Sequence, residues 1–516
     1  MTARKAPRTP RAPARSTTAR GKTSAIPAVT PLRVDDRSVT IVHLSAEVAP
    51  WARVGELGDT VAELAAAQAG GGRSVIVIAP AYRSVIAAYP ELVPVGEPFD
   101  VTVDDRHEVI ALLGEAEPDT RRPWLLFVDH RASFDRAGIY GDESGRWSDN
   151  PERFALLARA ALAAVQRLVA GPMVLHAHDW HAAAACALAA LEGTRRASVL
   201  TIHDAAFQGH LSRERLLALG LPRTMYTPEW FEWYGRANLL KGGVASATRV
   251  VATSPAHAAE LRSPAGGFGI DGALRWKGDR FTGVANGLDA SAWNPATDAR
   301  LAAKFGPGTI ADRAKNKQAL QRTTKLPVRA RTPLVLLPGP LTLRSGASIA
   351  LASEQLRTSD AHFVIAAEGD PFLVAGAHEL ARAHPDRVAV LAGWDDRAAR
   401  RALAGADFVL CPSLHEPSGR IARQALRYGS VVIARTTGAH ADLTDGGDLF
   451  RFQPFDVTAL DRAIEAAFAA FADKPSWTAR IKAALARPAG WDDAVTAYDA
   501  CYLDALGHLP GAGSST

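Results

Sequence analysis

Short apolar runs that end in glycine or polar residues recur along most of the chain. The first run, VTIVHLSA, begins at Val39, and it is followed by the helical pattern DTVAELAAAQAGGG and by a second run, SVIVIAP. Apolar runs that alternate with helices predict parallel strands that are buried on both faces. Because ligands bind beyond the carboxyl ends of such strands, the polar residues after each run are the first candidates for function.

The runs fall into two series. The first continues through PMVLHAHD, ASVLTIHD, TRVVATS and FTGVANG, and the second through PLVLLPG, HFVIAAEGD, RVAVLAGW, DFVLCPS and SVVIART. A chain of 516 residues is too long for one core. We therefore expect an α/β protein with two doubly wound domains and a ligand cleft between them. The expected division is 38–296 and 297–490, with a closing helix and tail at 491–516.

The composition is that of an ordinary globular protein, with 47% hydrophobic and 22% charged residues. The net charge of +5 comes from residues 1–37, which hold nine Lys/Arg and two acids and leave −2 for the rest. This segment has no apolar period and is predicted to be a disordered basic tail. Its charge would attract nucleic acid or acidic polymers, although a solubilising extension is the simpler interpretation. The near-neutral body disfavours a specific nucleic-acid reader.

The location of the protein is predicted from what the chain lacks. We find no apolar run long enough to span a bilayer and no signal-peptide pattern near the start. Cys186, Cys411 and Cys501 are widely separated and have no metal-ligand spacing, which is typical of small core residues in a reducing compartment. We therefore expect a cytoplasmic protein without a membrane partner.

Polar clusters stand at several strand ends. His178 and His181 are three residues apart, which would suit a metal, but no fourth ligand is near. Asp179 lies in a strand-to-helix turn, where helix capping or binding of sugar hydroxyls is the better interpretation. We therefore expect no metal and no cofactor. The clusters are HAHDWH at 176–181, TIHDAAFQG at 201–209, NLLKGG at 238–243 and HEPSG at 415–419, and the loop EVAPWARVGELGD at 47–59 carries the glycines of a phosphate-binding loop.

Taken in order, these stretches resemble one family, the bacterial glycogen synthases and plant starch synthases. The likeness runs from about Val39 to Leu506 and is most specific in SAEVAPWARVGELGDTVAEL, VLHAHDWHAA, TIHDAAFQG, LLKGGVASATRVVATSPAHAAEL, GFGIDGALR, GVANGLDASAWNPATD and EPSGRIARQALRYG. The resemblance implies two Rossmann-like domains facing a cleft, the GT-B glycosyltransferase architecture. It also implies transfer of glucose, with retention, from ADP-glucose to the non-reducing end of an α-1,4-glucan such as glycogen. The oligomeric state stays open.

The resemblance also implies roles by position. Asp179, His203 and Glu416 would be catalytic, the first two facing the reacting glucose and the third holding the donor sugar from the second domain. Helix capping or turn polarity is the alternative for these three residues, and simple solvation is the alternative for Lys241. The residues implied to bind the donor and its diphosphate are Arg53, Gly55, Gly58, Asn238, Lys241, Arg344, Ser418 and Gly419. Those implied to contact the acceptor or the sugar are Tyr140, His181 and Asp204.

The chain departs from the family pattern mainly around the diphosphate. The family loop reads Lys-Thr-Gly-Gly-Leu-Gly-Asp where this chain has RVGELGD, so Arg53 replaces a lysine and Glu56 a glycine. In LPGPLTLRSG, Pro340 and Ser345 replace the arginine and lysine that clamp the leaving diphosphate. Arg344 is one residue away, and a shift of one residue turns a side chain by about 100° on a helix, so full substitution is not expected.

Other departures are smaller, and they leave alternatives open. Asp204 replaces an asparagine and cannot donate a hydrogen bond when ionised. Ser418 replaces a cysteine, and Arg420 is either a new cation near the phosphates or a solvated helix residue. The chain is thus an active glucan synthase with a rearranged diphosphate site, a catalytically impaired relative that binds a glucan or a partner, or a transferase for another nucleotide sugar, for which Glu56 or Arg420 would recognise different groups.

Overall fold

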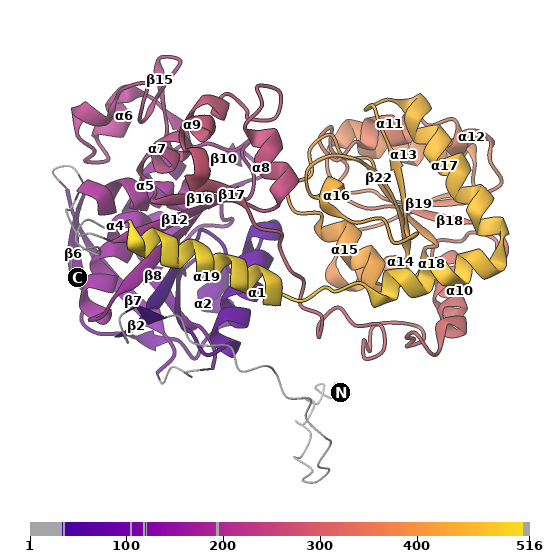
Figure 1. Cartoon of the computed structure of the whole chain (residues 1–516), viewed down its shortest axis with the longest axis horizontal. Helices are drawn as coiled ribbons and strands as arrows, with labels where there is room; N and C mark the ends of the chain where they lie inside the picture. Colours follow the sequence, from indigo (N-terminus) through magenta and orange to yellow (C-terminus); the bar gives the residue numbers. More distant parts are fainter. Residues whose placement is uncertain are drawn as a thin grey trace, which may run out of the picture.

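Two α/β bodies lie side by side in the structure, a computed structural model (Figure 1). Most of the predicted basic tail at 1–37 lies outside the described residues, although β1 (Arg33–Val34) and β2 (Arg37–Ser38) pair antiparallel. Among the described residues, no helix is both long and apolar enough for a membrane span. The structure describes residues 33–34, 37–103, 106–116, 119, 121–191 and 196–508.

The first body is built on a ten-stranded sheet with the order β17-β16-β12-β11-β3-β4-β8-β7-β5, in which β6 pairs with β7. The apolar runs predicted from sequence form its parallel centre, and β5, β6 and β7 extend it antiparallel. The strands are β3 (Thr40–Leu44), β4 (Ser74–Pro80), β5 (Val93–Pro94), β6 (Phe99–Val103), β7 (Arg106–Gly114), β8 (Trp124–Asp129), β11 (Met173–His178), β12 (Ala197–Ile202), β16 (Arg249–Ala252) and β17 (Phe281–Gly283).

Helices and small hairpins complete this body. The helices are α1 (Glu56–Gly70), α2 (Arg83–Ala88), α3 (Arg131–Phe134), α4 (Asn150–Leu168), α5 (Asp179–Leu191), α6 (Arg213–Leu217), α7 (Leu239–Ser246), α8 (Pro255–Leu261) and α9 (Asp271–Trp276). The short strands are β9 (Gly141–Asp142), β10 (Gly145–Arg146), β13 (His210–Leu211), β14 (Glu232–Trp233) and β15 (Arg236–Asn238). Because helices cover both faces, β3 and β4 are buried almost throughout.

The second body has a six-stranded parallel sheet with the order β20-β19-β18-β21-β22-β23. Its strands are β18 (Leu334–Leu337), β19 (His362–Ala366), β20 (Val388–Leu391), β21 (Phe408–Cys411), β22 (Val431–Arg435) and β23 (Leu449–Phe452). Its helices are α10 (Arg313–Thr323), α11 (Ala347–Ala352), α12 (Gln355–Thr358), α13 (Pro371–Ala383), α14 (Asp396–Gly405), α15 (Arg420–Arg427), α16 (Ala439–Asp442), α17 (Val457–Ala472) and α18 (Lys474–Ala486). This strand order changes direction between β18 and β21, where α/β proteins bind ligands.

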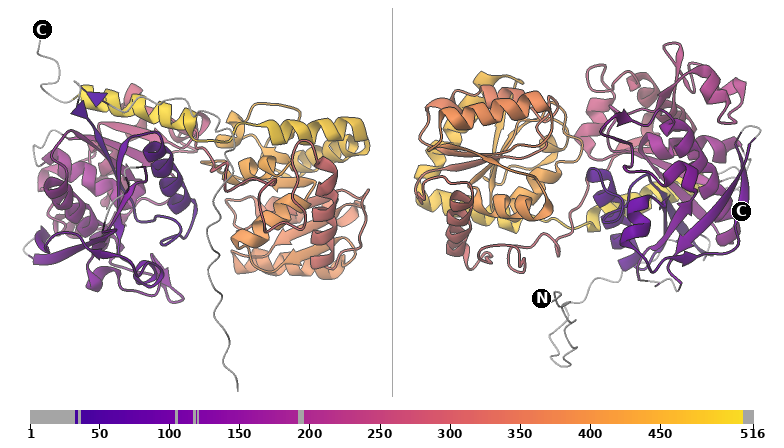
Figure 2. Two further views of the ribbon diagram at one scale, coloured as in Figure 1. Left: turned by 90° about the horizontal axis from the view of Figure 1, so that it is seen from below. Right: turned by 180° about the vertical axis from the view of Figure 1, so that it is seen from behind.

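Two neighbouring stretches of chain connect the bodies. One follows β17, and the other leads from α18 back to α19 (Asp492–Gly507), which lies along the first body (Figure 2). The N–H of Leu288 in the first stretch donates to the carbonyl of Ala489 in the second at 2.7 Å. A Cβ on Gly287 would come within 2.6 Å of the Gly490 carbonyl, so the two stretches touch there.

Candidate active site

The two bodies touch at the carboxyl ends of their strands. Thr253, just after β16, donates its hydroxyl proton to the carbonyl of Pro417 at 2.8 Å. Glu260 on α8 accepts from the Thr437 hydroxyl at 2.9 Å and from the Gly438 N–H at 2.8 Å. These bonds join the two bodies and bring residues from both sheets to one place.

Glu47 organises the predicted phosphate loop, and the sequence analysis did not single it out. Its buried carboxylate accepts from the N–H groups of Val54 at 2.7 Å and Gly55 at 3.2 Å, and from the Tyr140 hydroxyl at 2.6 Å. The Gly55 amide is therefore already bonded to protein. The only sequence signal for Glu47 is an acid placed directly after a buried strand.

The remaining residues of the loop have separate positions. A Cβ on Gly58 would lie 2.9 Å from the Ala52 carbonyl, so glycine is needed there for α1 to begin against the loop. Arg53 points outward, with 46% of its side chain exposed, and pairs with Asp59 at 2.8 Å. A small pocket lies beside the loop and is lined by Trp51, Arg53, Val54, Tyr82 and Arg136 among others.

Tyr140 and His181 stack on each other with ring centroids 4.9 Å apart. Burial lowers the pKa of His181 to about 3 and raises the pKa of Tyr140 well above its ordinary value. Both rings are therefore neutral. Because the Tyr140 hydroxyl bonds Glu47, the stacked pair packs against the residue that holds the phosphate loop.

Asp179 connects the ends of two neighbouring strands. It is the first residue of α5, directly after β11, and its Oδ1 accepts from the N–H groups of His203 at 2.7 Å and Asp204 at 3.2 Å, just after β12. Its φ of +56° lies in the left-handed region, which aspartate tolerates better than most residues. Burial raises the pKa of the Asp179 carboxyl well above its usual range. Asp179 thus holds His203 and Asp204 at the edge of the cleft.

Asp204 and Arg344 form a bidentate ion pair across the cleft. The Arg344 guanidinium donates to the two Asp204 oxygens at 2.8 and 2.9 Å. About a third of each side chain is exposed, 35% for Arg344 and 29% for Asp204. Asp204 and the displaced Arg344, which both depart from the family pattern, are therefore partners. The Asp204 carboxylate neutralises the arginine that lies nearest to the expected diphosphate clamp.

Replacing Asp204 with asparagine is expected to free Arg344 for the donor phosphates. Because a partly exposed ion pair is worth about 0–1 kcal/mol, kcat/KM for the donor should rise about 3- to 5-fold. Steady-state kinetics with varied nucleotide sugar measure the change. The gain should vanish when Arg344→Gln is added to Asp204→Asn, and an equal gain without Arg344 would contradict this role.

Glu416 is fixed from two sides in the second body. Its carboxylate accepts from the Gly419 N–H at 3.0 Å and from the Ser413 hydroxyl at 2.9 Å, and burial raises the pKa of its carboxyl. Gly419 has a φ of +66° before α15, a conformation that glycine adopts without strain. The Gly419 amide is thus already bonded to a carboxylate, as the Gly55 amide is on the other side of the cleft.

Glu56 faces these residues from the first body. The Ser418 hydroxyl donates to its carboxylate across the cleft. Glu56 is an exposed residue by its accessible surface, yet the protein packed around its carboxyl and the nearby Glu416 raise the pKa of that carboxyl to about 7, against the opposing effects of Ser418 and Arg420. This glutamate therefore changes charge near neutral pH, beside the place where a diphosphate is expected.

The donor reaction should slow as the pH rises through about 7. The protonated Glu56 is neutral, whereas the ionised form repels a diphosphate diester, whose own charge stays constant in this range. We expect kcat/KM for the donor to fall between pH 6 and 8, and Glu56→Gln, which keeps an acceptor for Ser418, to remove most of that fall. A profile that Glu56→Gln leaves unchanged would contradict this assignment.

Arg420 lies in the interface between the two bodies. Its guanidinium pairs with Glu63 on α1 at 2.6 Å and lies 3.5 Å from Asp59, and only 8% of its side chain is exposed. Glu63 also accepts from the N–H of Asp289 and from the indole of Trp491. Of the two interpretations left open by the sequence, a solvated helix residue is excluded, and the charge of Arg420 is taken up by acids of the first body.

Asn238 and Lys241 are bonded within the first body. Asn238 caps α7 by accepting from the Lys241 N–H at 2.9 Å, and its side-chain amide donates to Gln208. The Lys241 ammonium donates to the carbonyls of Pro228 and Glu232, and burial lowers the pKa of its amine. Both side chains therefore brace the segment before α7.

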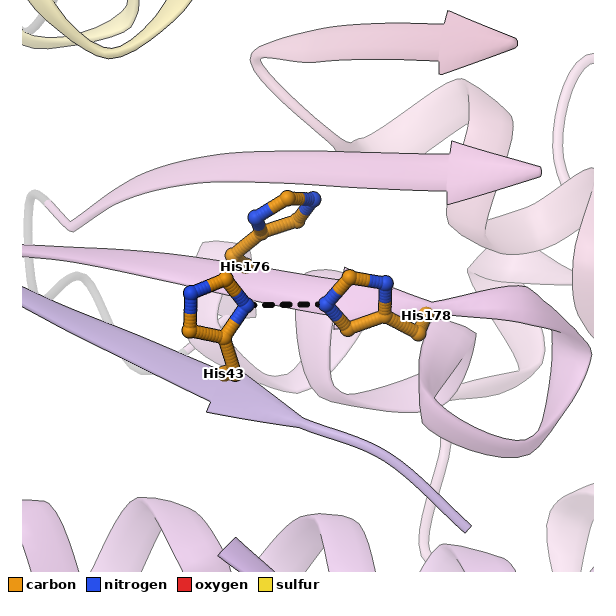
Figure 3. A group of neighbouring side chains, drawn as sticks. All are labelled: His43, His176 and His178. Carbon is orange, nitrogen blue, oxygen red and sulfur yellow. Dashed lines mark hydrogen bonds between the residues drawn. The ribbon is translucent and has the colours of Figure 1, made fainter. Parts of the chain in front are cut away.

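Within the described residues, one group of side chains has ligand atoms close enough to hold a metal, namely His43, His176 and His178 (Figure 3). Their ligand nitrogens lie within 4.8 Å of one another, deep in the sheet. His43 and His178 are hydrogen-bonded at 2.9 Å, and every other ring nitrogen of the three also has a protein partner. A metal would have to displace these bonds. His181, considered from its spacing, lies apart from this group.

Comparison with known families agrees along both bodies. A family described as starch synthase catalytic domain matches residues 40–276, and one described as glycosyl transferases group 1 matches residues 343–469. A glycogen synthase from Anaeromyxobacter dehalogenans is 37% identical over 482 residues, covering 90% of this chain and 98% of the relative. A glycogen synthase from Paramagnetospirillum magneticum is 35% identical, with 92% and 99% covered.

Solved structures give the same picture. The catalytic domain of starch synthase IV from Arabidopsis thaliana, bound to ADP and acarbose, superposes with a TM-score of 0.81 at 27% identity over 92% of this chain and all of that one. A sucrose-phosphate synthase from Thermosynechococcus elongatus shares the fold, with a TM-score of 0.57 at 16% identity over 90% of this chain.

Proposed function

Because the chain belongs to the glycogen and starch synthase family of glucosyltransferases with the GT-B fold, we propose that it transfers glucose from ADP-glucose to the non-reducing end of an α-1,4-glucan with retention. The observation that carries the proposal is that Asp179 holds the N–H groups of His203 and Asp204 at the strand ends of the first body, where Arg344 of the second body pairs with Asp204 across the cleft. The ADP and acarbose bound to the related starch synthase support an ADP-linked sugar donor and a glucan acceptor.

In this proposal the first body, residues 38–296, holds the acceptor, and the second, residues 297–490, holds the nucleotide sugar. Asp179 and His203 face the transferred glucose, and Glu416 binds the donor sugar. Arg53, Arg344, Asn238 and Lys241 serve the donor once it replaces the contacts that they make within the protein. We keep a cytoplasmic location as part of the proposal.

Compared with the family pattern, the chain has fewer free cations at the proposed position of the leaving diphosphate. An oxygen that gains charge in the transition state needs positioned donors, and removing one typically costs about 2.7–4 kcal/mol. Here Arg344 is neutralised by Asp204, Arg420 by Glu63, and Glu56 adds a titrating carboxyl. We therefore propose a slow transferase whose sugar contacts are better kept than its phosphate contacts.

The test is incubation of the purified protein with ADP-glucose and glycogen, with measurement of ADP release and of labelled glucose added to the glycogen. Slow turnover with ADP-glucose supports the proposal. Glycogen binding without ADP release would contradict it and favour a binding protein. Turnover with another nucleotide sugar alone would contradict the choice of donor and leave the transferase fold and the acceptor in place.

A further inference from the structure

A connected line of polar side chains runs through the core of the first body to the candidate active site. Its members are His43 on β3, Gln68 on α1, His178 at the end of β11 and Tyr502 on α19, and it ends at His203. All except His203 are buried. The predicted function uses His203 alone, so the buried members have no role assigned so far.

The line is continuous in hydrogen bonds. The Gln68 amide donates to the Tyr502 hydroxyl at 2.9 Å, and the Gln68 carbonyl oxygen bonds His43 Nε2 at 2.7 Å. His43 Nδ1 bonds His178 Nε2 at 2.9 Å, and His178 Nδ1 bonds His203 Nε2 at 2.9 Å. Three bonds thus separate Gln68 from His203, and each uses one nitrogen of each ring that it joins.

Each ring in the line is neutral. Burial lowers the pKa of His43 to about 4 and that of His203 to about 3, and it lowers the pKa of His178 well below the ordinary value. A neutral imidazole has one nitrogen that donates and one that accepts. The nitrogen that carries the proton in one ring therefore fixes which nitrogen carries it in the next ring.

The orientation of the Gln68 amide sets the direction in which every hydrogen bond of the line donates. Its carbonyl oxygen only accepts, so His43 must carry its proton on Nε2 and accept on Nδ1. His178 must then carry its proton on Nε2 and accept on Nδ1 from His203. His203 is left with a proton on Nε2 and a free lone pair on Nδ1.

A side branch obeys the same rule. Tyr502 accepts from Gln68, so its own proton goes to His176 Nδ1 at 2.7 Å, and His176 Nε2 donates to the Thr201 hydroxyl at 2.7 Å. Reversing the Gln68 amide would reverse every bond and move the protons of all four histidines to Nδ1. The network thus has two self-consistent states, selected together.

We propose that Gln68 is a positioning residue that fixes the tautomer of His203 through His43 and His178, so that His203 offers an unprotonated Nδ1 to a hydroxyl group of the transferred sugar. The ligand group selected is therefore a hydrogen-bond donor. This inference rests on the proposed function in one respect, the placement of the sugar beside His203. Gln68 lies on the helix that begins at Glu56, so the phosphate loop and the histidine line share one rigid element.

The first experiment reads the tautomers directly and needs no turnover. NMR of the intact protein labelled with ¹³C and ¹⁵N in histidine distinguishes Nε2–H from Nδ1–H rings, with assignment by single substitutions. We expect His43, His176, His178 and His203 all in the Nε2–H form. A His203 ring protonated on Nδ1 would overturn the proposal, whether or not the protein proves to be a glucan synthase.

The second experiment separates the line from simple packing. Gln68→Met keeps the size of the side chain and removes its hydrogen bonds, whereas Gln68→Glu keeps an oxygen acceptor for His43. The proposal expects Gln68→Met to lower kcat/KM for the donor about 3- to 10-fold, the effect of one hydrogen bond, with little change in KM for the glucan. Gln68→Glu should keep the Nε2–H form of His203 and most of the rate.

A packing role predicts the opposite order, because methionine suits a buried site better than glutamate does. A Gln68→Met protein with the wild-type His203 tautomer and a rate above that of Gln68→Glu would overturn the proposal. The His181 resonances, which lie outside the line, and the melting temperature report whether either variant is misfolded. Absence of turnover in every protein would count against the proposed function and leave the tautomer prediction testable by NMR alone.

Discussion

Pro340→Arg combined with Ser345→Lys is expected to raise kcat/KM for ADP-glucose by about 100-fold or more, since one positioned donor at a developing oxyanion is typically worth about 2.7–4 kcal/mol. The two positions lie on the loop between β18 and α11, beside the cleft. Pro340 is exposed, and Ser345 makes only local bonds with Thr342. The measurement is initial-rate kinetics of ADP release with varied ADP-glucose.

The matched control is Pro340→Gln with Ser345→Gln, which adds similar bulk without charge. The charged pair should gain rate and the neutral pair should not. Asp204→Asn added to the charged pair should increase the gain further, because it frees Arg344 as a third cation. No gain from the charged pair in a folded protein would show that loss of cations does not limit the reaction.

Asp179→Ala is expected to lower kcat by about 100- to 1,000-fold, the range found when one positioned electrostatic group is removed from an active site. The substitution leaves the partly buried N–H groups of His203 and Asp204 without their acceptor. The free energy of unfolding should also fall by about 1–3 kcal/mol, the cost of an unsatisfied buried donor. Chemical denaturation measures the second effect and turnover the first.

Asp179→Asn distinguishes the two effects. It keeps an oxygen acceptor for both N–H groups, so the lost stability should return. Any rate that stays lost in the asparagine variant then belongs to the carboxyl group. Wild-type turnover in Asp179→Ala would mean that the residue only caps α5, the alternative left open from the sequence.

The sequence predicts the parallel centre of both sheets well, because strands buried on both faces are continuous apolar runs. VTIVHLSA and SVIVIAP become β3 and β4, and DFVLCPS and SVVIART become β21 and β22. The antiparallel extension by β6 and β7 was not predicted. Its strand FDVTV alternates between buried and exposed residues, unlike the continuous apolar runs of the parallel strands.

The candidate site was predictable only in its strand-end members. Asp179 and His203 follow β11 and β12 directly, so the sheet brings them together. The pairs of Arg344 with Asp204 and of Arg420 with Glu63 join residues more than a hundred positions apart. No local period encodes such contacts. Glu47, which holds the loop, and the bonds of Lys241 to two carbonyls likewise required the three-dimensional structure.

The two neighbouring connections at Gly287–Leu288 and Ala489–Gly490 have a mechanical consequence. We expect these two connecting stretches, which are hydrogen-bonded to each other, to act as a hinge. The two bodies can rotate about this hinge but cannot twist against each other. Opening about this hinge must break the ion pairs of Arg344 with Asp204 and of Arg420 with Glu63 together, because each pair joins one body to the other. Substrate and product must therefore pass on the side opposite these connections, and the contacts between the bodies, these two ion pairs among them, set how often that side opens.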